Sequence, residues 1–227
     1  MTQPVIPDVA LVDNTEQRTP LVLVLDCSGS MGGPPIKQLN EGLQLLEREL
    51  KDDVIAAKRV RLLVIRYGGL DTAEVVGDWC DAMDFTAPTL EANGTTPTGQ
   101  AVELALGEIE AEKARYKQSG IAYTRPWLFL MSDGVPTDAW EASAQRCCEA
   151  ERSHKVAVFP IAVGEGSHTD TLGAFCSRGT AGVKQLAGLQ FNELFLWLST
   201  SMQAVSQSKT GDQVQLPATD SWSTVTA

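Results

Sequence analysis

Short apolar runs alternate along this chain with segments in which apolar residues recur at helical spacing. Residues 21–25 and 127–131 are continuous apolar runs, which are typical of strands buried on both faces of a parallel sheet. Between them, apolar residues at steps of three and four over residues 36–50 predict an amphipathic helix that begins near Pro34 and Pro35. Because parallel strands need crossover connections, this alternation predicts a doubly wound, mostly parallel α/β fold with helices on both faces of the sheet.

The remaining elements follow from the same patterns. A short antiparallel strand around residues 73–76 would form one edge of the sheet. Asp138 and Glu141 have the spacing of a capping box that would open the helix ending near Cys148. Pro160 has no N–H to donate, so we expect a bulge or an unpaired donor in its strand. Further strands are predicted over residues 61–67, 156–163 and 182–185, and further helices over residues 98–116, 138–148, 169–176 and 191–205.

The length of 227 residues suits one large domain. We place this domain over residues 1–205 and a tail over residues 206–227, where the sequence becomes rich in Ser, Thr and Gln and loses its periodicity. Its polar composition predicts a disordered tail. Trp222 is the exception, since it would dock the tail on the domain until phosphorylation of the hydroxyls in residues 219–226 released it.

The chain is strongly acidic, with 29 acidic and 18 basic residues and a formal net charge of −11. Such a field repels phosphate backbones and anionic lipids, so we expect neither nucleic acid nor membrane surfaces as partners. No stretch reaches the roughly 20 apolar residues that span a bilayer, and the first residues lack the regions of a secretory signal. The five cysteines have no regular spacing, which is typical of reduced thiols. These features predict a cytoplasmic protein.

Three segments that follow predicted strands or precede a predicted helix carry oxygen ligands. Asp26, Ser28 and Ser30 come directly after the first strand, and alternation along this loop places their side chains on one side. Asp133 follows the strand over residues 127–131, and residues 93–99 supply further hydroxyls before a helix. In open parallel sheets, ligands bind beyond the carboxyl ends of the strands, where such loops converge. The sequence therefore predicts a cluster of carboxylates and hydroxyls at this edge of the sheet.

This predicted cluster has the chemistry of a site for a hard divalent cation. Oxygen ligands favour Mg²⁺, Mn²⁺ or Ca²⁺ over zinc or copper. Two carboxylates and a few hydroxyls do not fill six coordination positions, so the ion would keep waters or accept a carboxylate from outside. We therefore expect a protein partner that supplies an acidic side chain to the metal.

Three motifs resemble the metal-ion-dependent adhesion site of the von Willebrand factor A superfamily. They are Asp26-x-Ser28-x-Ser30, Gly-Thr-Thr-Pro-Thr-Gly at residues 94–99, and Ser-Asp-Gly at residues 132–134. The resemblance implies that Ser28, Ser30 and Thr96 bind the ion directly, while Asp26 and Asp133 act mainly through water. Thr95 stands where the family usually has a second glycine. The similarity in the order of the elements extends over residues 19–206.

Within this superfamily, residues 23–32 and 96–101, with a Val-Ser-Gln-Ser segment from residue 205 and a later Leu-Pro, are similar to the bacterial TerY group. That group is associated with tellurite resistance and stress response, and is often encoded beside a protein kinase and a phosphatase. The resemblance implies a role in such a system, with a kinase and a phosphatase as further partners.

The alternative function is a metal-dependent hydrolase or phosphatase that uses the same site. Ser28, Asp133 and then His154 or His168 follow the Ser…Asp…His order of α/β-hydrolases. However, the glycines of the Gly-x-Ser-x-Gly elbow are missing on both sides of Ser28, and the next loop residues lack the Lys-Ser/Thr of a phosphate-binding P-loop. We therefore expect a binding module rather than an enzyme.

An acidic run follows the strand over residues 61–67. It consists of Asp71, Glu74, Asp78, Asp81 and Asp84. We interpret this run as a solvated face that selects partners by repulsion, rather than as a second metal site.

Overall fold

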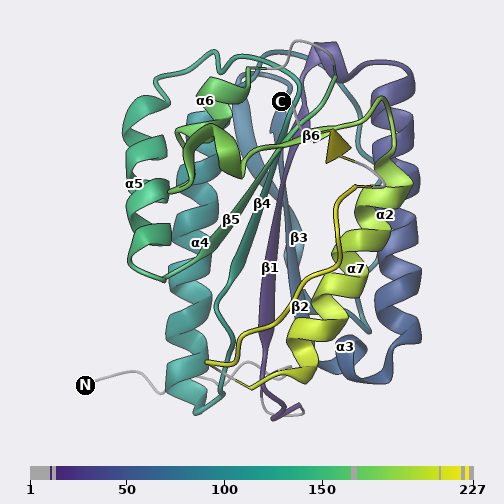
Figure 1. Cartoon of the computed structure of the whole chain (residues 1–227), viewed down its shortest axis with the longest axis vertical. Coiled ribbons are helices and arrows are strands. Elements are labelled where there is room, and N and C mark those ends of the chain that lie inside the picture. The colour runs from purple at the N-terminus through teal and green to yellow at the C-terminus, as the bar shows by residue number, and fades with distance from the viewer. Residues whose placement is uncertain (1–10, 12–13, 165–167, 210, 221–222, 225–227) are drawn as a thin grey trace.

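The computed structural model describes residues 11, 14–164, 168–209, 211–220 and 223–224. The strands of these residues form one seven-stranded sheet in the order β3-β2-β1-β4-β5-β6-β7 (Figure 1). Their bounds are Thr19–Cys27 for β1, Val60–Gly68 for β2, Thr72–Asp81 for β3, Trp127–Ser132 for β4, Ala157–Ala162 for β5, Lys184–Leu186 for β6 and Ser223–Thr224 for β7. All neighbouring pairs are parallel except β2–β3 and β6–β7. The predicted doubly wound, mostly parallel α/β fold is therefore confirmed.

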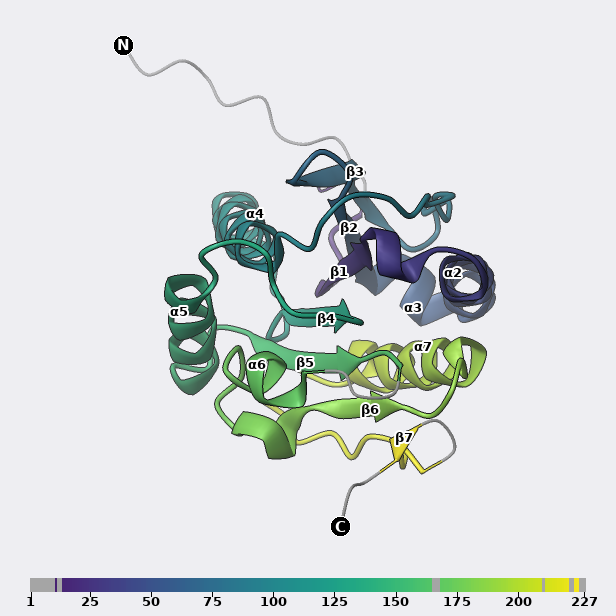
Figure 2. The same cartoon turned by 90° about the horizontal axis from the view of Figure 1, so that it is seen from above.

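Helices cover both faces of the sheet, as Figure 2 shows: α2, α3 and α7 lie on one face, and α4, α5 and α6 on the other. Their bounds are Pro34–Asp52 for α2, Val54–Arg59 for α3, Thr98–Ser119 for α4, Glu141–Arg152 for α5, Thr169–Gly173 for α6 and Phe191–Gln207 for α7. Two short 3₁₀ turns, η1 (Gly29–Met31) and η2 (Gly179–Gly182), complete the described helical elements.

Both faces of β1 are buried, which explains its continuous apolar sequence. Leu21, Leu23 and Leu25 belong to the core under α2 and α7, where the leucines of α2 pack against the aromatic residues of α7. Val22 and Val24 belong to the second core, under α4 and α5. Successive side chains of a strand point to opposite faces, so one apolar run serves two cores. The central strand is thus fixed from both sides, and its carboxyl end is a rigid support for the loop that follows.

The edges of the sheet differ from the prediction. The strand expected around residues 73–76 is antiparallel as predicted, but it extends over the whole of β3. A second antiparallel strand, β7, lies in the segment after residue 205. In the same segment, Val214 and Leu216 pack on the core beneath α7, and the indole N–H of Trp197 donates to the Pro217 carbonyl at 2.9 Å. Trp222, on which the docking hypothesis depends, lies outside the described residues.

Of the two outcomes expected at Pro160, a bulge or an unpaired donor, the bulge is absent, and that part of the prediction is wrong. The register between β4 and β5 is continuous from Trp127 opposite Ala157 to the last pair of the strands. On its other side, β5 pairs with β6 only through Ile161 and Ala162. Because β6 stops short of Pro160, no neighbouring strand needs an N–H from the proline.

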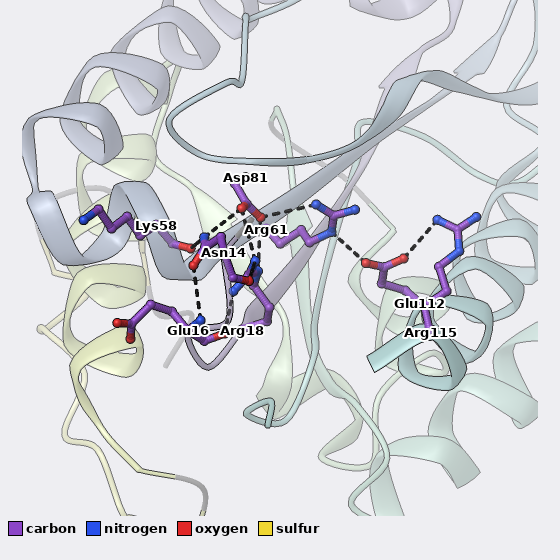
Figure 3. A network of polar contacts seen from close by, with 8 residues as sticks. All are labelled: Asn14, Glu16, Arg18, Lys58, Arg61, Asp81, Glu112 and Arg115. Carbon is purple, nitrogen blue, oxygen red and sulfur yellow. Dashed lines mark hydrogen bonds and ion pairs between the residues drawn. The ribbon is translucent and has the colours of Figure 1, made fainter. Parts of the chain in front are cut away.

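Asp81 is not part of a solvated face, so the interpretation of the acidic run is wrong for this residue. Asp81 is 4% exposed and forms ion pairs with Arg18 at 3.2 Å and Arg61 at 3.3 Å (Figure 3). Arg61 also pairs with Glu112 of α4 at 2.6 Å. The other four acidic residues of the run are exposed. The buried network joins the starts of β1 and β2 to the end of β3 and to α4. It therefore lies at the amino ends of β1 and β2, whereas the predicted site lies at the carboxyl ends of β1 and β4.

The five cysteines are free thiols. Burial raises the pKa of Cys27 to about 12, and the neighbouring charge of Asp26 adds to this effect. Cys27 is therefore protonated at neutral pH and is not a nucleophile. Among the residues that the structure describes, no helix has the length and apolar character needed to cross a membrane.

Candidate metal centre

Asp26 connects the carboxyl ends of two neighbouring strands. It lies near the end of β1 and is fully buried. Its Oδ1 accepts the Ser28 N–H at 2.8 Å, and its Oδ2 accepts the Ser132 hydroxyl at 2.8 Å. The Asp133 N–H lies 3.4 Å from the same Oδ2. The carboxylate therefore fixes the loop after β1 against the end of β4.

A chain of hydroxyls leads from this buried carboxylate to the surface. The Ser28 and Ser30 Oγ atoms lie 3.0 Å apart, and the Ser30 hydroxyl donates to Asp133 Oδ1 at 2.8 Å. Ser28 is buried, Asp133 is half-buried and Ser30 is exposed. We call Asp26, Ser28, Ser30 and Asp133 the oxygen cluster. It brings together four of the five predicted site residues at the edge of the sheet that is uppermost in Figure 1.

Thr96, the fifth predicted residue, lies in the loop before α4. It is buried, its N–H donates to Thr137 Oγ1 at 3.1 Å, and its carbonyl accepts the Thr137 N–H at 2.9 Å. Among the hydrogen bonds of the described residues, none joins the Thr96 hydroxyl to the oxygen cluster. The neighbouring Thr95 hydroxyl donates to the carboxylate of Asp71 in the turn between β2 and β3. Of the two adjacent threonines, Thr96 therefore remains the candidate ligand.

Main-chain contacts hold the loop of Thr96 against the loop after β1. The Asn93 N–H donates to the Cys27 carbonyl at 2.8 Å, and the Gly29 N–H donates to the Gly94 carbonyl at 3.0 Å. Gly94 has a φ of 72°, and a side chain there would collide with the main chain of Gly69. Only glycine allows this close approach, so Gly94 is a structural requirement of the site.

Asp138 does not open α5, so the predicted capping box is wrong. Its carboxylate instead accepts the Gly99 N–H at 3.1 Å and the Gln100 N–H at 2.8 Å, in the first turn of α4. Trp140 occupies the cap of α5 and makes no side-chain cap hydrogen bond. An anionic group is favourable at any helix N-terminus, and the tertiary fold places Asp138 at α4. The loop that carries Asp133 is thereby tied to the loop that carries Thr96.

Sequence reasoning missed three residues that position the site. Ser132 lies in the Ser-Asp-Gly motif and was a detectable candidate, since it ends a strand beside Asp133. Thr137 and Asp138 act on a helix and a loop about forty residues away in the chain, and the sequence carries no local signal for those contacts.

The oxygen cluster concentrates negative charge without a basic counterpart. Burial raises the pKa of Asp26 to about 6, and the charge of Asp133 contributes to this rise. The hydrogen bonds from Ser28 act in the opposite direction and lower the pKa. Burial also raises the pKa of Asp133. Among the described residues, neither carboxylate has a basic ion-pair partner. Two confined carboxylates with converging hydroxyls fit a hard divalent cation.

Comparisons with known proteins agree with this architecture. The family model of the von Willebrand factor type A domain matches residues 21–187. No curated protein gave a match.

Several solved structures share the fold. The open conformation of the pilus adhesin SpaC from Lactobacillus rhamnosus GG is 13% identical, with a TM-score of 0.67 over 84% of this chain and 31% of the adhesin. The manganese-loaded TRAP protein of Plasmodium vivax is 16% identical, with a TM-score of 0.52 over 81% of this chain and 73% of TRAP. The proximal thread matrix protein 1 of the mussel byssus, with a zinc-occupied MIDAS motif, is 11% identical, with a TM-score of 0.50 over 83% of this chain and 48% of that protein. The chain thus spans less than half of the adhesin and of the mussel protein. At sequence identities this low, the structural similarity shows a common fold and nothing more.

Proposed function

Because this chain belongs to the von Willebrand factor type A domain family, we propose that it is an interaction module whose oxygen cluster and Thr96 bind one divalent cation, through which the module holds an acidic side chain of a partner protein. The observation that carries this proposal is the hydrogen-bonded convergence of the buried Ser28 with Ser30 and Asp133, which leads from the buried Asp26 to the surface. Two of the similar structures, TRAP and the mussel protein, contain manganese or zinc, which supports a cation here.

The residues of the site have different roles in this proposal. Ser28, Ser30 and Thr96 would supply neutral hydroxyl oxygens to the ion, and Asp133 would supply charge at the half-buried rim. Asp26 uses both carboxylate oxygens within the protein, so it orients the loop and balances the charge from behind. Hard oxygen donors favour Mg²⁺ or Mn²⁺, with Ca²⁺ next. A bound ion would attract an external carboxylate, because neutral hydroxyl ligands neutralise little of its charge.

The surroundings of the site favour a particular kind of acidic partner. Leu70, at the turn after β2, is 92% exposed, and Val135, after β4, is 47% exposed. In the sheet, β1 lies between these two strands, so the apolar side chains belong to the loops on either side of the oxygen cluster. The exposed carboxylates of Asp71 and Glu91 lie in neighbouring loops. A partner with one acidic residue beside apolar residues, in an otherwise neutral or basic segment, would fit this surface.

A catalytic function has less support. Ser28 Oγ contacts Ser30, and the hydrogen bonds of the described residues connect neither His154 nor His168 to Ser28. His154 follows α5 at the opposite end of the sheet, and His168 precedes α6. Neither histidine is therefore hydrogen-bonded to this hydroxyl, as the general base of a hydrolase would be, and the hydrolase alternative has less support.

The finer part of the proposal is biological. The similarity of residues 23–32 and 96–101 to the bacterial TerY group supports a role in a cytoplasmic tellurite or stress-response system that includes a kinase and a phosphatase. Under this proposal one of those proteins, or a substrate that they share, supplies the acidic side chain.

Water proton relaxation of Mn²⁺ tests the proposal, because it reports both the bound ion and the waters that the ion keeps. The wild-type protein should bind one Mn²⁺, and Ser28→Ala and Thr96→Ala should weaken binding by about tenfold or more. Ser153→Ala and Thr200→Ala, at exposed positions on other elements, are matched controls. A peptide with one glutamate beside leucine should displace water from the bound ion and so lower the relaxation rate of the water protons. The same peptide with glutamine in place of glutamate should leave this rate unchanged. Equal binding by the site and control variants would contradict the proposal.

A further inference from the structure

A hollow lies beside β5 where the neighbouring strand ends early. β6 pairs only with Ile161 and Ala162, so the first half of β5 has no strand partner on this side. Two side chains replace the missing strand: Glu151 Oε1 accepts the Val158 N–H at 3.0 Å, and Arg178 donates to the Val158 carbonyl. These side chains bound a cavity of about 450 Å³. It is lined by Arg125, Glu151, Arg152, His154, Ala157, Phe159, Ser177 and Arg178.

The charge of this cavity is opposite to that of the whole protein. Three guanidinium groups and one carboxylate line it, which leaves a net charge of +2 with His154 neutral, in a chain whose net charge is −11. The carboxylate is already engaged, because Glu151 Oε2 accepts both the N–H and the hydroxyl of Ser177 at 2.6 Å. Glu151 lies 3.7 Å from Arg178 as well. One carboxylate therefore balances only part of the positive charge.

The arginines retain donors that the protein does not use. The Arg125 Nη2 donates to the Glu151 carbonyl at 2.8 Å, but its buried Nε has no partner in the structure. The Arg178 guanidinium carbon lies over the Phe159 ring, 5.8 Å from its centre, so an aromatic ring limits the movement of this side chain. Arg152 is exposed at the rim. An arginine carries five N–H donors in a fixed fork, so main-chain bonds to neutral carbonyls leave most of this capacity free.

We propose that this cavity is a binding site for a phosphate monoester. A doubly charged phosphate matches the net charge of the cavity, and its oxygens match paired guanidinium donors better than a single carboxylate does. The cavity lies at the amino end of β5, whereas the oxygen cluster lies at the carboxyl ends of β1 and β4. The two sites are thus at opposite edges of the sheet, and the phosphate site requires no cation. Binding there would let the module recognise a phosphorylated group independently of an acidic one.

Histidine NMR gives a direct test, because the chain has only two histidines and both are exposed. His154 lines the cavity, and His168, outside it, is an internal reference. Inorganic phosphate and a phosphoserine peptide, titrated at constant ionic strength in the presence of a chelator, should shift the His154 ring signals saturably and leave those of His168 unchanged. Chloride and the unphosphorylated peptide should shift neither.

Variants of the arginines complete the test. Arg152→Gln removes an exposed guanidinium without touching a main-chain bond, and should weaken phosphate binding by about tenfold, while Arg48→Gln on α2 should have no effect. If the peptide binds about tenfold more tightly than inorganic phosphate, the ligand is a phosphorylated protein. Equal affinities would support a small phosphorylated molecule. Unsaturable or equal shifts of both histidines, or binding unchanged by Arg152→Gln, would overturn the proposal.

Discussion

Replacing Asp26 with asparagine should stabilise the cation-free protein at neutral pH. Burial raises the pKa of this carboxyl from 3.8 to about 6, so its ionised form is disfavoured in the folded state. At about 1.36 kcal/mol per pKa unit, this rise corresponds to about 3 kcal/mol at pH values above both pKa values. Asparagine has the shape of the neutral acid, and its amide can still accept the Ser28 N–H. Allowing for imperfect contacts with Ser132, we expect a gain of about 1–3 kcal/mol.

The pH dependence of this gain has a definite sign. Between pH 3.8 and about 6, the folded protein binds more protons at Asp26 than the unfolded chain does. The stability of the wild-type protein therefore falls as the pH rises through this window, and the variant lacks this contribution. The difference between the two proteins should be small near pH 4 and complete by about pH 7.5.

Urea unfolding in a chelator at pH 4.5 and pH 7.5 measures both quantities. Asp84→Asn, at an exposed position, is the matched control and should stay within about 0.5 kcal/mol of the wild type. Excess Mn²⁺ should raise the stability of the wild type and have little effect on Asp26→Asn. A loss of stability in the variant at pH 7.5, or a difference that is the same at both pH values, would refute the reasoning.

Three further substitutions test single contacts. Asp81→Ala should lower the free energy of unfolding, measured in urea, by about 3–5 kcal/mol, because two buried guanidinium groups lose a counter-charge. The exposed Asp78→Ala is the control, and a loss in Asp81→Ala no larger than in this control would contradict the prediction. Asp138→Ala should cost about 1 kcal/mol as a lost cap and weaken Mn²⁺ binding severalfold in the relaxation titration; unchanged Mn²⁺ affinity would show that the tie to α4 is not needed. Leu216→Ala should lower the free energy of unfolding, measured in urea, by about 1 kcal/mol, because the Leu216 side chain packs on the core under α7. The Mn²⁺ affinity should be unchanged. A variant as stable as the wild type would show that this segment does not stabilise the fold.

The central strands were predictable because both their faces are buried. The apolar runs in β1 and β4 have no solvated side, so the sequence pattern reflects the sheet directly. The leucine spacing of α2 was equally informative, because one face of this helix packs on the core. In contrast, β7 has two residues and too little sequence for any periodicity.

Contacts between distant parts of the chain were not predictable. The spacing of Asp138 and Glu141 matched the capping box of a helix that would begin there. In the structure, however, the Asp138 carboxylate accepts hydrogen bonds from the first turn of α4. Asp81 resembled its exposed acidic neighbours, and its burial is explained by its pairing with Arg61 and with Arg18, which is 63 residues away. The oxygen cluster was predictable to the extent that strand ends meet at one edge of a parallel sheet. The residues that hold its loops together were not.

Anomalous diffraction from crystals soaked in Mn²⁺ tests the central claim most directly. We predict a single strong anomalous peak about 2 Å from the hydroxyl oxygens of Ser28, Ser30 and Thr96, with Asp26 behind it. Crystals of Ser28→Ala, which removes a single hydroxyl, should lack the peak. A peak elsewhere, or full occupancy in the Ser28→Ala crystals, would contradict the assignment of the oxygen cluster as a metal centre.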